Sequence, residues 1–437
     1  MKFSIDEQTS SDLELFEQAW DGTSVFSYFD FACSDGGKAC MRRMFESPLV
    51  DARQIRERVD AMIYLGQLPF FLDIRREELN FIEIYLQQDA VPKRNVLHLT
   101  SRAVKGWLNP DNDCFLRQRA VPYLGRLIHE LGTFMNELPM GSIPKMVKDL
   151  QQEVKKVLAR EGMQYLTNQK KDSFWSRENL DLYFRGEELG GVRVVLDTLY
   201  MLDALRTVGT IAKEQGLTFP LFSGERRMVR IEGLYHLFLK EPVRNDVLLD
   251  GQRHLCFLTG PNMAGKSTYM KAFGVAVYLA HCGFPVPASR MELSPFRGLF
   301  TTINLSDNLS LGYSHYYNEV ARVKYVVEQV RDLEDVVVVF DELFRGTNVK
   351  DAFDASRAVV GALARLKQGV FMISSHIVEV AGTLEKEDSV DFRFFDIRME
   401  NDEPRYTYHL REGVSEERIG MYILRKAGVV DLIESLK

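Results

Sequence analysis

One stretch decides the fold of the C-terminal half of this chain: Gly260-Pro261-Asn262-Met263-Ala264-Gly265-Lys266-Ser267. It has the form GxxxxGKS, in which glycines let the backbone wrap around a phosphate group with its N–H groups pointing inward. In such a loop the side chain of Lys266 reaches the β- and γ-phosphates, and the hydroxyl of Ser267 is a ligand for Mg²⁺. The stretch therefore predicts a binding site for a nucleoside triphosphate.

The residues on either side of this loop agree with that interpretation. The apolar run 255–258 is typical of a buried strand, and the residues from Ser267 and Thr268 onward are typical of a helix. The N-terminal dipole of that helix would add to the phosphate site. A chance glycine turn is the alternative, and the order of strand, loop and helix argues against it.

An acidic pair follows a second apolar run. Residues 336–340, four valines and a phenylalanine, predict a parallel strand buried on both faces, and Asp341-Glu342 comes directly after it. An aspartate at the carboxyl end of such a strand can hold the Mg²⁺ of a bound triphosphate, directly or through water. Glu342 is placed to orient and deprotonate the attacking water. Taken alone such a pair is more often a strand that meets solvent, but about 75 residues after a phosphate loop it indicates catalysis.

Two further segments accompany these motifs. Residues 369–375 predict a third strand, which delivers His376. A lone histidine is usually structural, but one at the end of this strand can instead sense the γ-phosphate. Between the loop and the acidic pair, residues 306–314 are rich in Ser, Asn and Gly and lead into valines at helical spacing from Val320 to Val330. Composition alone predicts a capped helix there and nothing more.

Four motifs in this order resemble the ATPase domain of MutS proteins: GPNMAGKSTYMK, DNLSLGYSHYYNEV, VVVVFDELFRGT and SSHIVEV. In that family the ATPase domains dimerise, and a loop of each crosses to the partner's nucleotide. The resemblance implies that Ser314 hydrogen-bonds the γ-phosphate held by the other subunit. It also implies that Asn262 belongs to the γ-phosphate and Mg²⁺ sensing network, and that residues 345–347 and Asp351 line the dimer interface.

The chain departs from the family pattern at several positions. The usual Ser-Thr-Phe is Ser314-His315-Tyr316 here, and Asn348-Val349 replace the Ser-Thr that usually follows Gly-Thr. An aromatic residue that often packs on the adenine aligns near Val243, and Tyr408 is an alternative source of an aromatic face. None of these changes touches the loop lysine and serine or the acidic pair. The resemblance therefore implies that hydrolysis survives and that communication between the two sites differs.

The first half of the chain predicts helices. The run from Ser24 to Leu65 resembles the start of the MutS core domain, with a break at residues 34–37, and Asp51 can cap the helix that follows Pro48. Residues 145–160 predict a helix with exposed lysines that could contact phosphates, although such a run is more often a solvated surface. Outgoing and returning helices would make a lever, as in the family.

The resemblance also predicts absences. The core-like pattern begins near residue 24, which leaves no room for the family's N-terminal mismatch-binding and connector domains. The long clamp insert looks reduced. Phe81-Ile82-Glu83 matches the Phe-x-Glu wedge of the mismatch readers, but it lies in an amphipathic helical pattern, which predicts a packing role.

Composition sets the remaining expectations. With 437 residues, 46% of them hydrophobic and 27% charged, the chain fits a soluble protein of two or three domains. There is no membrane-length apolar run and no signal-peptide core, and the five scattered cysteines look like reduced core thiols. We therefore expect a cytoplasmic protein with no membrane partner. A net charge of −7 neither indicates nor excludes nucleic-acid binding.

The predicted fold is an α/β P-loop NTPase domain of the ABC type, MutS-like, preceded by an all-α core and lever. We place a helical core in residues 1–90, a helical lever with a reduced clamp in 91–216, and the ATPase domain in 217–437. The predicted cofactors are ATP and Mg²⁺. The residues expected to act are Glu342, His376 and Lys266 in catalysis, 260–268 and Ser314 in nucleotide binding, and Ser267 and Asp341 as Mg²⁺ ligands.

The predicted function is an ATPase that couples ATP binding and hydrolysis at a homodimer interface to double-stranded or branched DNA, in repair or recombination. One alternative is a nucleotide-switched dimeric binding module for branched DNA, ribosomes or protein partners, without mismatch recognition. Another is a generic ABC-type or chromosome-maintenance ATPase, against which Asn262-Met263 and the absence of long heptads argue.

Overall fold

The chain divides into two compact units in a computed structural model. We call the first the sheet unit; it comprises Met1–Tyr28, Phe45–Arg56 and Glu214–Lys437. We call the second the helical unit; it comprises Phe29–Met44 and Glu57–Lys213. The domain boundaries at residues 90 and 216 stay predictions. The structure describes residues 2–16, 23–73, 75–88, 112–139, 141–163, 179–261, 263–304, 315–400, 403–415, 426 and 428–435.

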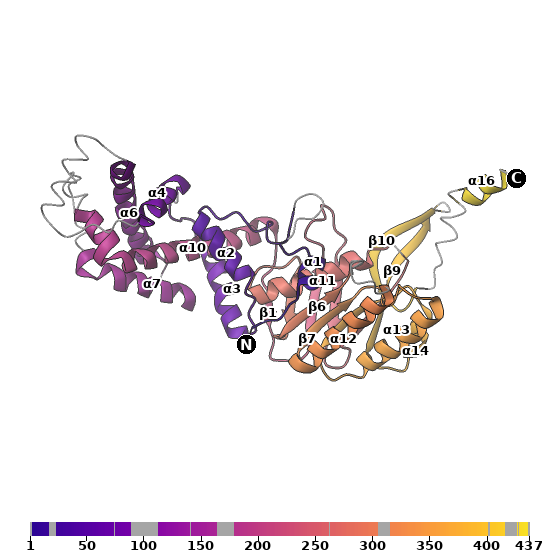
Figure 1. The fold of residues 1–437 in the computed structure, drawn as a ribbon. Coiled ribbons are helices and arrows are strands. Elements are labelled where there is room, and N and C mark those ends of the chain that lie inside the picture. The colour runs from indigo at the N-terminus through magenta and orange to yellow at the C-terminus, as the bar shows by residue number, and fades with distance from the viewer. Residues whose placement is uncertain are drawn as a thin grey trace. The chain divides into compact units, whose positions relative to one another are not determined.

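A six-stranded sheet forms the centre of the sheet unit, with strand order β10-β9-β4-β8-β7-β6 (Figure 1). All neighbouring strands are parallel except β10 and β9, so the carboxyl ends of β4, β8 and β7 meet at one edge. These three strands are buried along their whole length, as their apolar runs predict. The bounds are Leu255–Thr259 (β4), Gly298–Thr302 (β6), Val336–Phe340 (β7), Val370–Ser374 (β8), Val390–Glu400 (β9) and Glu403–Glu412 (β10).

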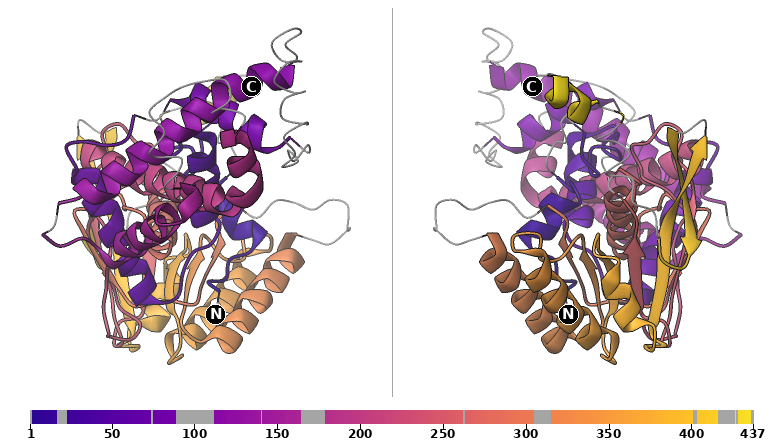
Figure 2. Two further views of the ribbon diagram at one scale, coloured as in Figure 1. Left: turned by 90° about the vertical axis from the view of Figure 1, so that its left-hand side faces the viewer. Right: turned by 90° about the vertical axis from the view of Figure 1, so that its right-hand side faces the viewer.

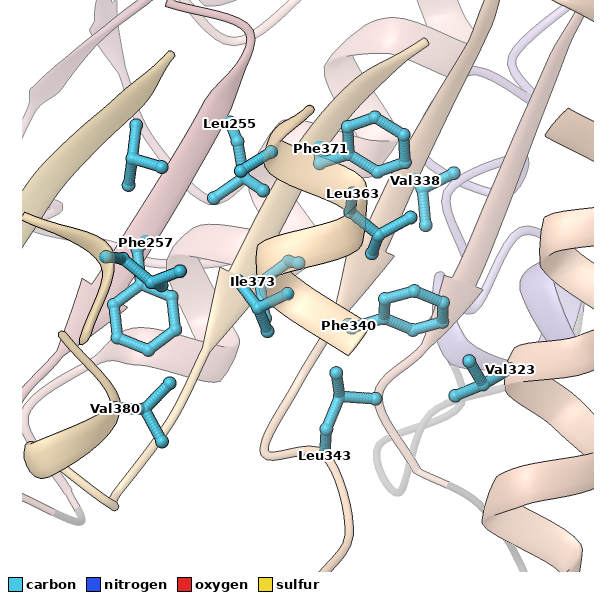
Figure 3. Close-up of a cluster of buried hydrophobic side chains, with 14 of the residues drawn as sticks. Leu255, Phe257, Val323, Val338, Phe340, Leu343, Leu363, Phe371, Ile373 and Val380 are labelled. Carbon is cyan, nitrogen blue, oxygen red and sulfur yellow. The ribbon is translucent and has the colours of Figure 1, made fainter. Parts of the chain in front are cut away.

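Helices cover this sheet. Apolar side chains of α12 (His315–Leu333), α13 (Val349–Ala364) and α14 (Glu379–Leu384) pack on alternate residues of the strands, among them Phe257 and Ile373 (Figure 3). Both views in Figure 2 place these orange helices on the opposite side of the unit from the long yellow strands β9 and β10. α11 (Lys266–Cys282) follows β4, is buried along most of its length and contacts β6.

A smaller, four-stranded sheet has the strand order β1-β5-β2-β3, in which β1, β2 and β3 precede the phosphate loop and β5 follows α11. Its β3 leads directly into β4, and both sheets mix parallel with antiparallel pairs. These two mixed sheets and their helices confirm the predicted α/β fold of this half. The bounds are Leu221–Phe222 (β1), Val229–Leu234 (β2), Asn245–Leu249 (β3) and Arg290–Leu293 (β5).

The N-terminus of the chain packs on the edge of the six-stranded sheet, which the sequence did not lead us to expect. Ser4 pairs with Gly298 in parallel, so it extends the sheet beyond β6. The short helix α1 (Glu7–Asp12) then lies against β6. The first residues of the chain are therefore part of the same unit as the phosphate loop.

Helices make up the described part of the helical unit, which contains no strand (Figure 1). The helix predicted over 145–160 is α7. The elements are α2 (Asp35–Phe45), α3 (Ala52–Gln67), α4 (Arg76–Leu86), α6 (Asn112–Glu137), α7 (Lys145–Leu158), the π-helical turn η1 (Tyr183–Glu187) and α10 (Leu189–Gln215).

The predicted break at residues 34–37 is wrong for residues 35–37, which form the first turn of α2, whereas Ser34 lies just before that helix. The glycines there serve close packing. A Cβ on Gly36 would lie 2.5 Å from the ring of Tyr200, and the N–H of Gly37 donates to the hydroxyl of Ser34 at 2.9 Å. The two glycines therefore allow close side-chain packing at the start of α2 rather than a break in the helix.

Two local predictions in this half are confirmed. The Asp51 carboxylate accepts a hydrogen bond from the N–H of Arg53 at 2.8 Å, directly before α3. Phe81 packs edge-on against the ring of Phe115, with ring centroids 6.3 Å apart, so the wedge-like tripeptide lies in a packed helix.

Four of the five cysteines are buried, as predicted, whereas Cys33 is exposed. Burial raises the pKa of the Cys256 thiol to about 12, so this side chain stays a protonated core residue. No helix in the described part of the chain is long and apolar enough to cross a membrane.

Candidate functional site

The phosphate loop leaves β4 and turns into α11. Gly260 (φ 135°) and Gly265 (φ 103°) both adopt backbone conformations that other residues disfavour. Gly265 also caps the N-terminus of α11, and a Cβ on it would lie 3.3 Å from the ring of Tyr408. Backbone conformation and close approach thus both require a glycine at this position.

The Lys266 side chain is buried and folds back onto the loop. Its Nζ donates to the carbonyl oxygens of Gly260 at 2.7 Å and Pro261 at 3.1 Å. The same nitrogen lies 3.4 Å from Oε1 of Glu342. The ammonium group of Lys266 therefore lies between two carbonyl oxygens of the loop and the carboxylate of Glu342.

Asp341 is held by two hydroxyl groups from neighbouring elements. Ser267, in the first turn of α11, donates from Oγ to Oδ2 at 2.5 Å, and Ser374, at the end of β8, donates to Oδ1. The N–H of Asp341 donates to the carbonyl of Thr302, the last residue of β6, at 2.9 Å. The sequence did not predict a role for Ser374. Its position two residues before His376, at the end of β8, could have indicated one.

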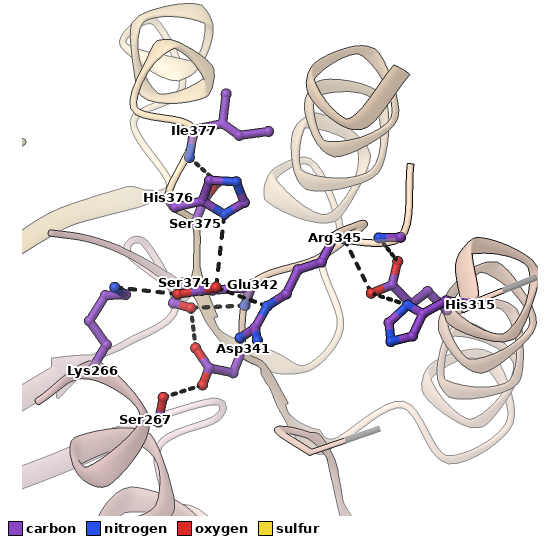
Figure 4. A network of polar contacts seen from close by, with 12 residues as sticks. Lys266, Ser267, His315, Asp341, Glu342, Arg345, Ser374, Ser375, His376 and Ile377 are labelled. Carbon is purple, nitrogen blue, oxygen red and sulfur yellow. Dashed lines mark hydrogen bonds and ion pairs between the residues drawn. The ribbon is translucent and has the colours of Figure 1, made fainter. Parts of the chain in front are cut away.

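Glu342 lies among three basic side chains (Figure 4). Oε1 faces Lys266, while Oε2 forms an ion pair with Nε of Arg345 at 2.8 Å and lies 3.9 Å from Nδ1 of His376. The Glu342 N–H donates to the Ser374 hydroxyl at 2.9 Å, so one serine orients both members of the acidic pair. His376 is about half exposed (51%), whereas the carboxylate is largely buried (10%).

A cavity of about 530 Å³ opens beside the loop. Its wall contains loop and helix residues 265–269, the acid Glu342 and side chains from the β2–β3 connection and β10. Val243 and Tyr408, the two positions considered for an adenine contact, both line this cavity. The volume lies within the range of small-molecule sites.

Tyr408 owes its place to Asn245. The pairing of β10 with β9 shifts register between Tyr406 and Leu410, and Tyr408 within this irregularity has a φ of 58°. The Asn245 side chain spans it: Nδ2 donates to the Tyr408 carbonyl at 3.0 Å, and Oδ1 accepts from the Leu410 N–H at 2.7 Å. Asn245, the first residue of β3, thus holds the backbone that places the Tyr408 ring next to Gly265 of the phosphate loop.

A second cavity, of about 300 Å³, also has the acidic pair in its wall, together with residues 302–304 and the start of α12. Glu319 of α12 is buried there and accepts from the N–H groups of Arg345 at 3.2 Å and Gly346 at 3.4 Å. The segment predicted to line a dimer interface is therefore tied to α12.

The structure brings together five of the predicted residues at one sheet edge: Lys266, Ser267, Asp341, Glu342 and His376. Pro261, Met263, Ala264 and Thr268 lie in the loop or the first turn of α11. Asn262 and Ser314 lie outside the described residues, so their roles stay predictions.

Ser267 and Asp341 fit a hard cation such as Mg²⁺, because a hydroxyl and a carboxylate oxygen, the ligand types that Mg²⁺ prefers, lie side by side. Among the described residues no group of three or more His, Cys, Asp or Glu side chains could hold a metal ion. Proteins often bind Mg²⁺ through one or two carboxylates together with substrate phosphates.

The family model for MutS domain V matches residues 256–435, which include the phosphate loop, the acidic pair and His376. This part of the chain is therefore similar to domain V of MutS proteins. MutS domain V is an ATPase-type α/β domain, in agreement with the sheets and helices of the sheet unit.

Three curated relatives carry the name DNA mismatch repair protein MutS. That of Lactococcus lactis subsp. lactis is 28% identical over 247 residues, which cover 55% of this chain and 29% of the relative. Those of Thermosipho melanesiensis and Streptococcus sanguinis are 27% and 26% identical, and the matches cover 56% of this chain and 30% and 29% of the relatives. The matched part of the chain thus spans under a third of each relative.

Proposed function

We propose that this MutS-like chain is a Mg²⁺-dependent ATPase. One observation carries the proposal: Lys266, Ser267, Asp341, Glu342 and His376 meet at the carboxyl edge of three parallel strands, beside a cavity of about 530 Å³. A phosphate loop, a metal-binding pair and a water-orienting acid are the parts that phosphoryl transfer to water requires.

The phosphate-binding residues act by position and charge. Lys266 exchanges the loop carbonyls that it contacts now for the β- and γ-phosphates, which the inward N–H groups of the loop also bind. Ser267 and Asp341 would hold Mg²⁺, and Ser374 keeps the Asp341 carboxylate oriented. When bound, Mg²⁺ would neutralise charge on the β- and γ-phosphates.

Glu342 is the proposed general base. Its carboxylate orients the attacking water and takes its proton. Arg345 and His376, at 2.8 and 3.9 Å from this carboxylate, are placed to stabilise the charge that moves onto the γ-phosphate. The adenine would lie in the cavity beside the ring of Tyr408, whose approach to Gly265 places it over the loop.

We further propose a homodimer in which Ser314 of each chain completes the site of the other, coupled to double-stranded or branched DNA in repair. The support is the family and the relatives' name, DNA mismatch repair protein MutS. The hydrogen bonds from the backbone N–H groups of residues 345–346 to the Glu319 carboxylate support a shared role of these two segments at such an interface.

One observation favours a second candidate, a nucleotide-switched dimer that turns over slowly. Both oxygens of Glu342 are engaged by basic side chains, Lys266 on one and Arg345 on the other. The base is free to orient water only after these contacts change, so binding and hydrolysis can be separate events.

Steady-state ATP turnover tests both candidates, with matched, mismatched and branched duplexes added in turn and Glu342→Ala as the blank. We expect Mg²⁺-dependent turnover that one of these DNA structures stimulates and that Glu342→Ala abolishes. Turnover unaffected by every duplex would contradict the DNA role, and nucleotide-dependent dimers without turnover would favour the switch.

A further inference from the structure

Asp12, the last residue of α1, is a buried carboxylate that grips the end of β6. Its Oδ2 accepts from the hydroxyl of Thr301 at 2.7 Å and from the N–H of Ile303 at 2.8 Å, and its Oδ1 accepts from the N–H of Asn304 at 2.9 Å. The side chain is only 2% exposed. Hydrogen bonds to a carboxylate are short and strong, so this one group fixes the path of the chain as it leaves β6.

Two other side chains of α1 contact the same residues. The Thr9 hydroxyl accepts from the N–H of Thr301 at 2.9 Å, and the Gln8 amide donates to the carbonyl of Asn304 at 3.0 Å. Thr9 is fully buried. Side chains of α1 therefore make several hydrogen bonds along residues 301–304, and the attachment of this segment does not depend on one bond.

An ion pair fastens the start of α1 to α12. Arg322 bonds both oxygens of Asp6 and also donates to the carbonyl of Thr301 at 2.6 Å and the hydroxyl of Thr302 at 3.2 Å. Burial alone would raise the pKa of Asp6, but the hydrogen bonds and charge of Arg322 lower it below its ordinary value. The guanidinium thus joins α1, β6 and α12.

The end of β6 is in direct contact with the proposed ATP site. The carbonyl of Thr302 accepts from the N–H of Asp341 at 2.9 Å. Ile303 and Asn304 line the cavity of about 300 Å³ whose wall also holds Asp341 and Glu342. Whatever fixes residues 301–304 therefore also fixes the backbone of the proposed Mg²⁺ ligand.

The residues directly after α1 contact α11, the helix that begins at Lys266 of the phosphate loop. Leu13 packs so closely on α11 that a Cβ on Gly274 would lie 2.7 Å from its Cδ2, and Glu14 pairs with Lys271 at 2.8 Å. Residues near the N-terminus therefore contact both α11 and the end of β6, the elements on either side of Asp341.

We propose that residues 6–12, called here the N-terminal brace, position Asp341 for ATP hydrolysis, with Asp12 as the positioning residue. This role rests on the ATPase function proposed above. Asp12 lines neither of the two cavities beside the acidic pair. It acts by holding residues 301–304, and through Thr302 it sets the backbone that carries Asp341.

The test is Asp12→Asn, with Asp203→Asn as the matched control. Asp203 is also 2% exposed and accepts from three groups, the N–H of Cys33 and the N–H and hydroxyl of Ser34, against four for Asp12 when the Gln8 amide is included. It lies in the helical unit, so it provides a similar loss of buried hydrogen bonding without contact to residues 301–304. The full chain is used, at a temperature where circular dichroism shows both variants folded.

Two readouts decide the proposal. For Asp12→Asn we expect faster amide exchange in peptides covering 301–304 and 340–342, a roughly 10-fold lower kcat, and a higher Mg²⁺ concentration for half-maximal rate. The KM for ATP should change less than about 3-fold, because Lys266 and the loop N–H groups still bind the phosphates. Asp203→Asn should keep kcat within about 2-fold.

Equal kcat losses in the two variants, or an Asp12→Asn enzyme with unchanged kcat and Mg²⁺ dependence, would overturn the positioning role. Faster exchange confined to 301–304, with the Asp341 amide unaffected, would also overturn it. If the wild type itself shows no turnover above the Glu342→Ala blank, the ATPase proposal fails instead, and exchange at Asp341 still judges the brace.

Discussion

The sheet unit and the helical unit each bury a carboxylate among basic groups, but with opposite results. In the helical unit, Asp181 accepts from Tyr85 at 2.6 Å and from two nitrogens of Arg185 at 2.6 and 2.8 Å. Both charged side chains are nearly inaccessible, at 0% and 4% exposed. The remaining guanidinium nitrogen donates to Gln88 at 2.9 Å, so the contacts close within the chain.

The carboxylate of Glu342 has a different environment. Its three basic neighbours, Lys266, Arg345 and His376, come from three separate segments at 2.8 to 3.9 Å, and it lines two cavities. The Asp181–Arg185 pair is a structural contact buried within the helical unit. An open carboxylate can change partners, and an acid that changes partners can take part in a reaction.

Glu342→Gln should have the largest effect. It keeps the shape of the side chain but removes the base, so we expect ATP turnover to fall roughly 10³-fold, about 4 kcal/mol in barrier height. The thermal unfolding midpoint should change little, because Lys266 retains its loop carbonyls. A large loss of stability in this variant would mean that Glu342 is a structural acid like Asp181.

Asp181→Ala should show the reverse pattern. Removing one partner leaves the Arg185 charge buried without its carboxylate, which costs about 3 kcal/mol or more in the free energy of unfolding. Urea denaturation measures this cost, and turnover below the unfolding transition should stay near wild type. A loss below 1 kcal/mol, or a matching loss of turnover, would break the distinction between the two units.

His281 extends the contrast to pH. Its Nδ1 donates to the carbonyl of Leu49 at 2.7 Å, and its Nε2 accepts from the N–H of Phe296 at 3.3 Å, so the buried ring is neutral. Burial lowers its pKa from 6.5 to about 4, against the opposing effect of the bond to Leu49.

As the pH falls below 6.5, the His281 ring becomes protonated in the unfolded chain but stays neutral in the folded chain until the pH approaches 4. The stability contributed by His281 is therefore present above pH 6.5 and is lost as the pH falls toward 4, by about 2 kcal/mol at pH 5. Urea midpoints at pH 7 and 5, compared with His281→Gln, measure it. An identical pH dependence in that variant would contradict the assignment.

Tyr408→Ala should have the smallest effect. Loss of an aromatic face on the adenine weakens ATP binding by about 1 kcal/mol, roughly 5-fold, with kcat unchanged. Tyr408→Phe is the control and should bind ATP as the wild type does, since the hydroxyl is not needed for stacking. Equal weakening in both variants would remove the stacking role.

The sequence predicted what is local. The phosphate loop and the strands β4, β7 and β8 follow from short runs whose chemistry and spacing suffice, and the helix after residue 314 follows from its valine spacing. The junction of these elements at one sheet edge was predictable too, since carboxyl ends of parallel strands meet there.

What the sequence did not predict depends on contacts between distant segments. Asp12 and Thr301 are 289 positions apart, and nothing in a short run of polar residues near the N-terminus indicates a buried carboxylate. Gly36 and Gly37 suggested a break because glycine disfavours helices, but the approach of Tyr200 to Gly36 and of Asp203 to Gly37 requires them. Tertiary contact decided these positions against their local preference.

The most direct test of the central claim is Mg²⁺-dependent ATP turnover by the full chain, measured beside nucleotide binding in Glu342→Gln and Lys266→Ala. We predict wild-type turnover well above the Glu342→Gln blank, near-normal ATP binding in Glu342→Gln, and weakened binding in Lys266→Ala. Wild-type turnover no higher than that blank, with binding intact in all three proteins, would contradict hydrolysis at this site.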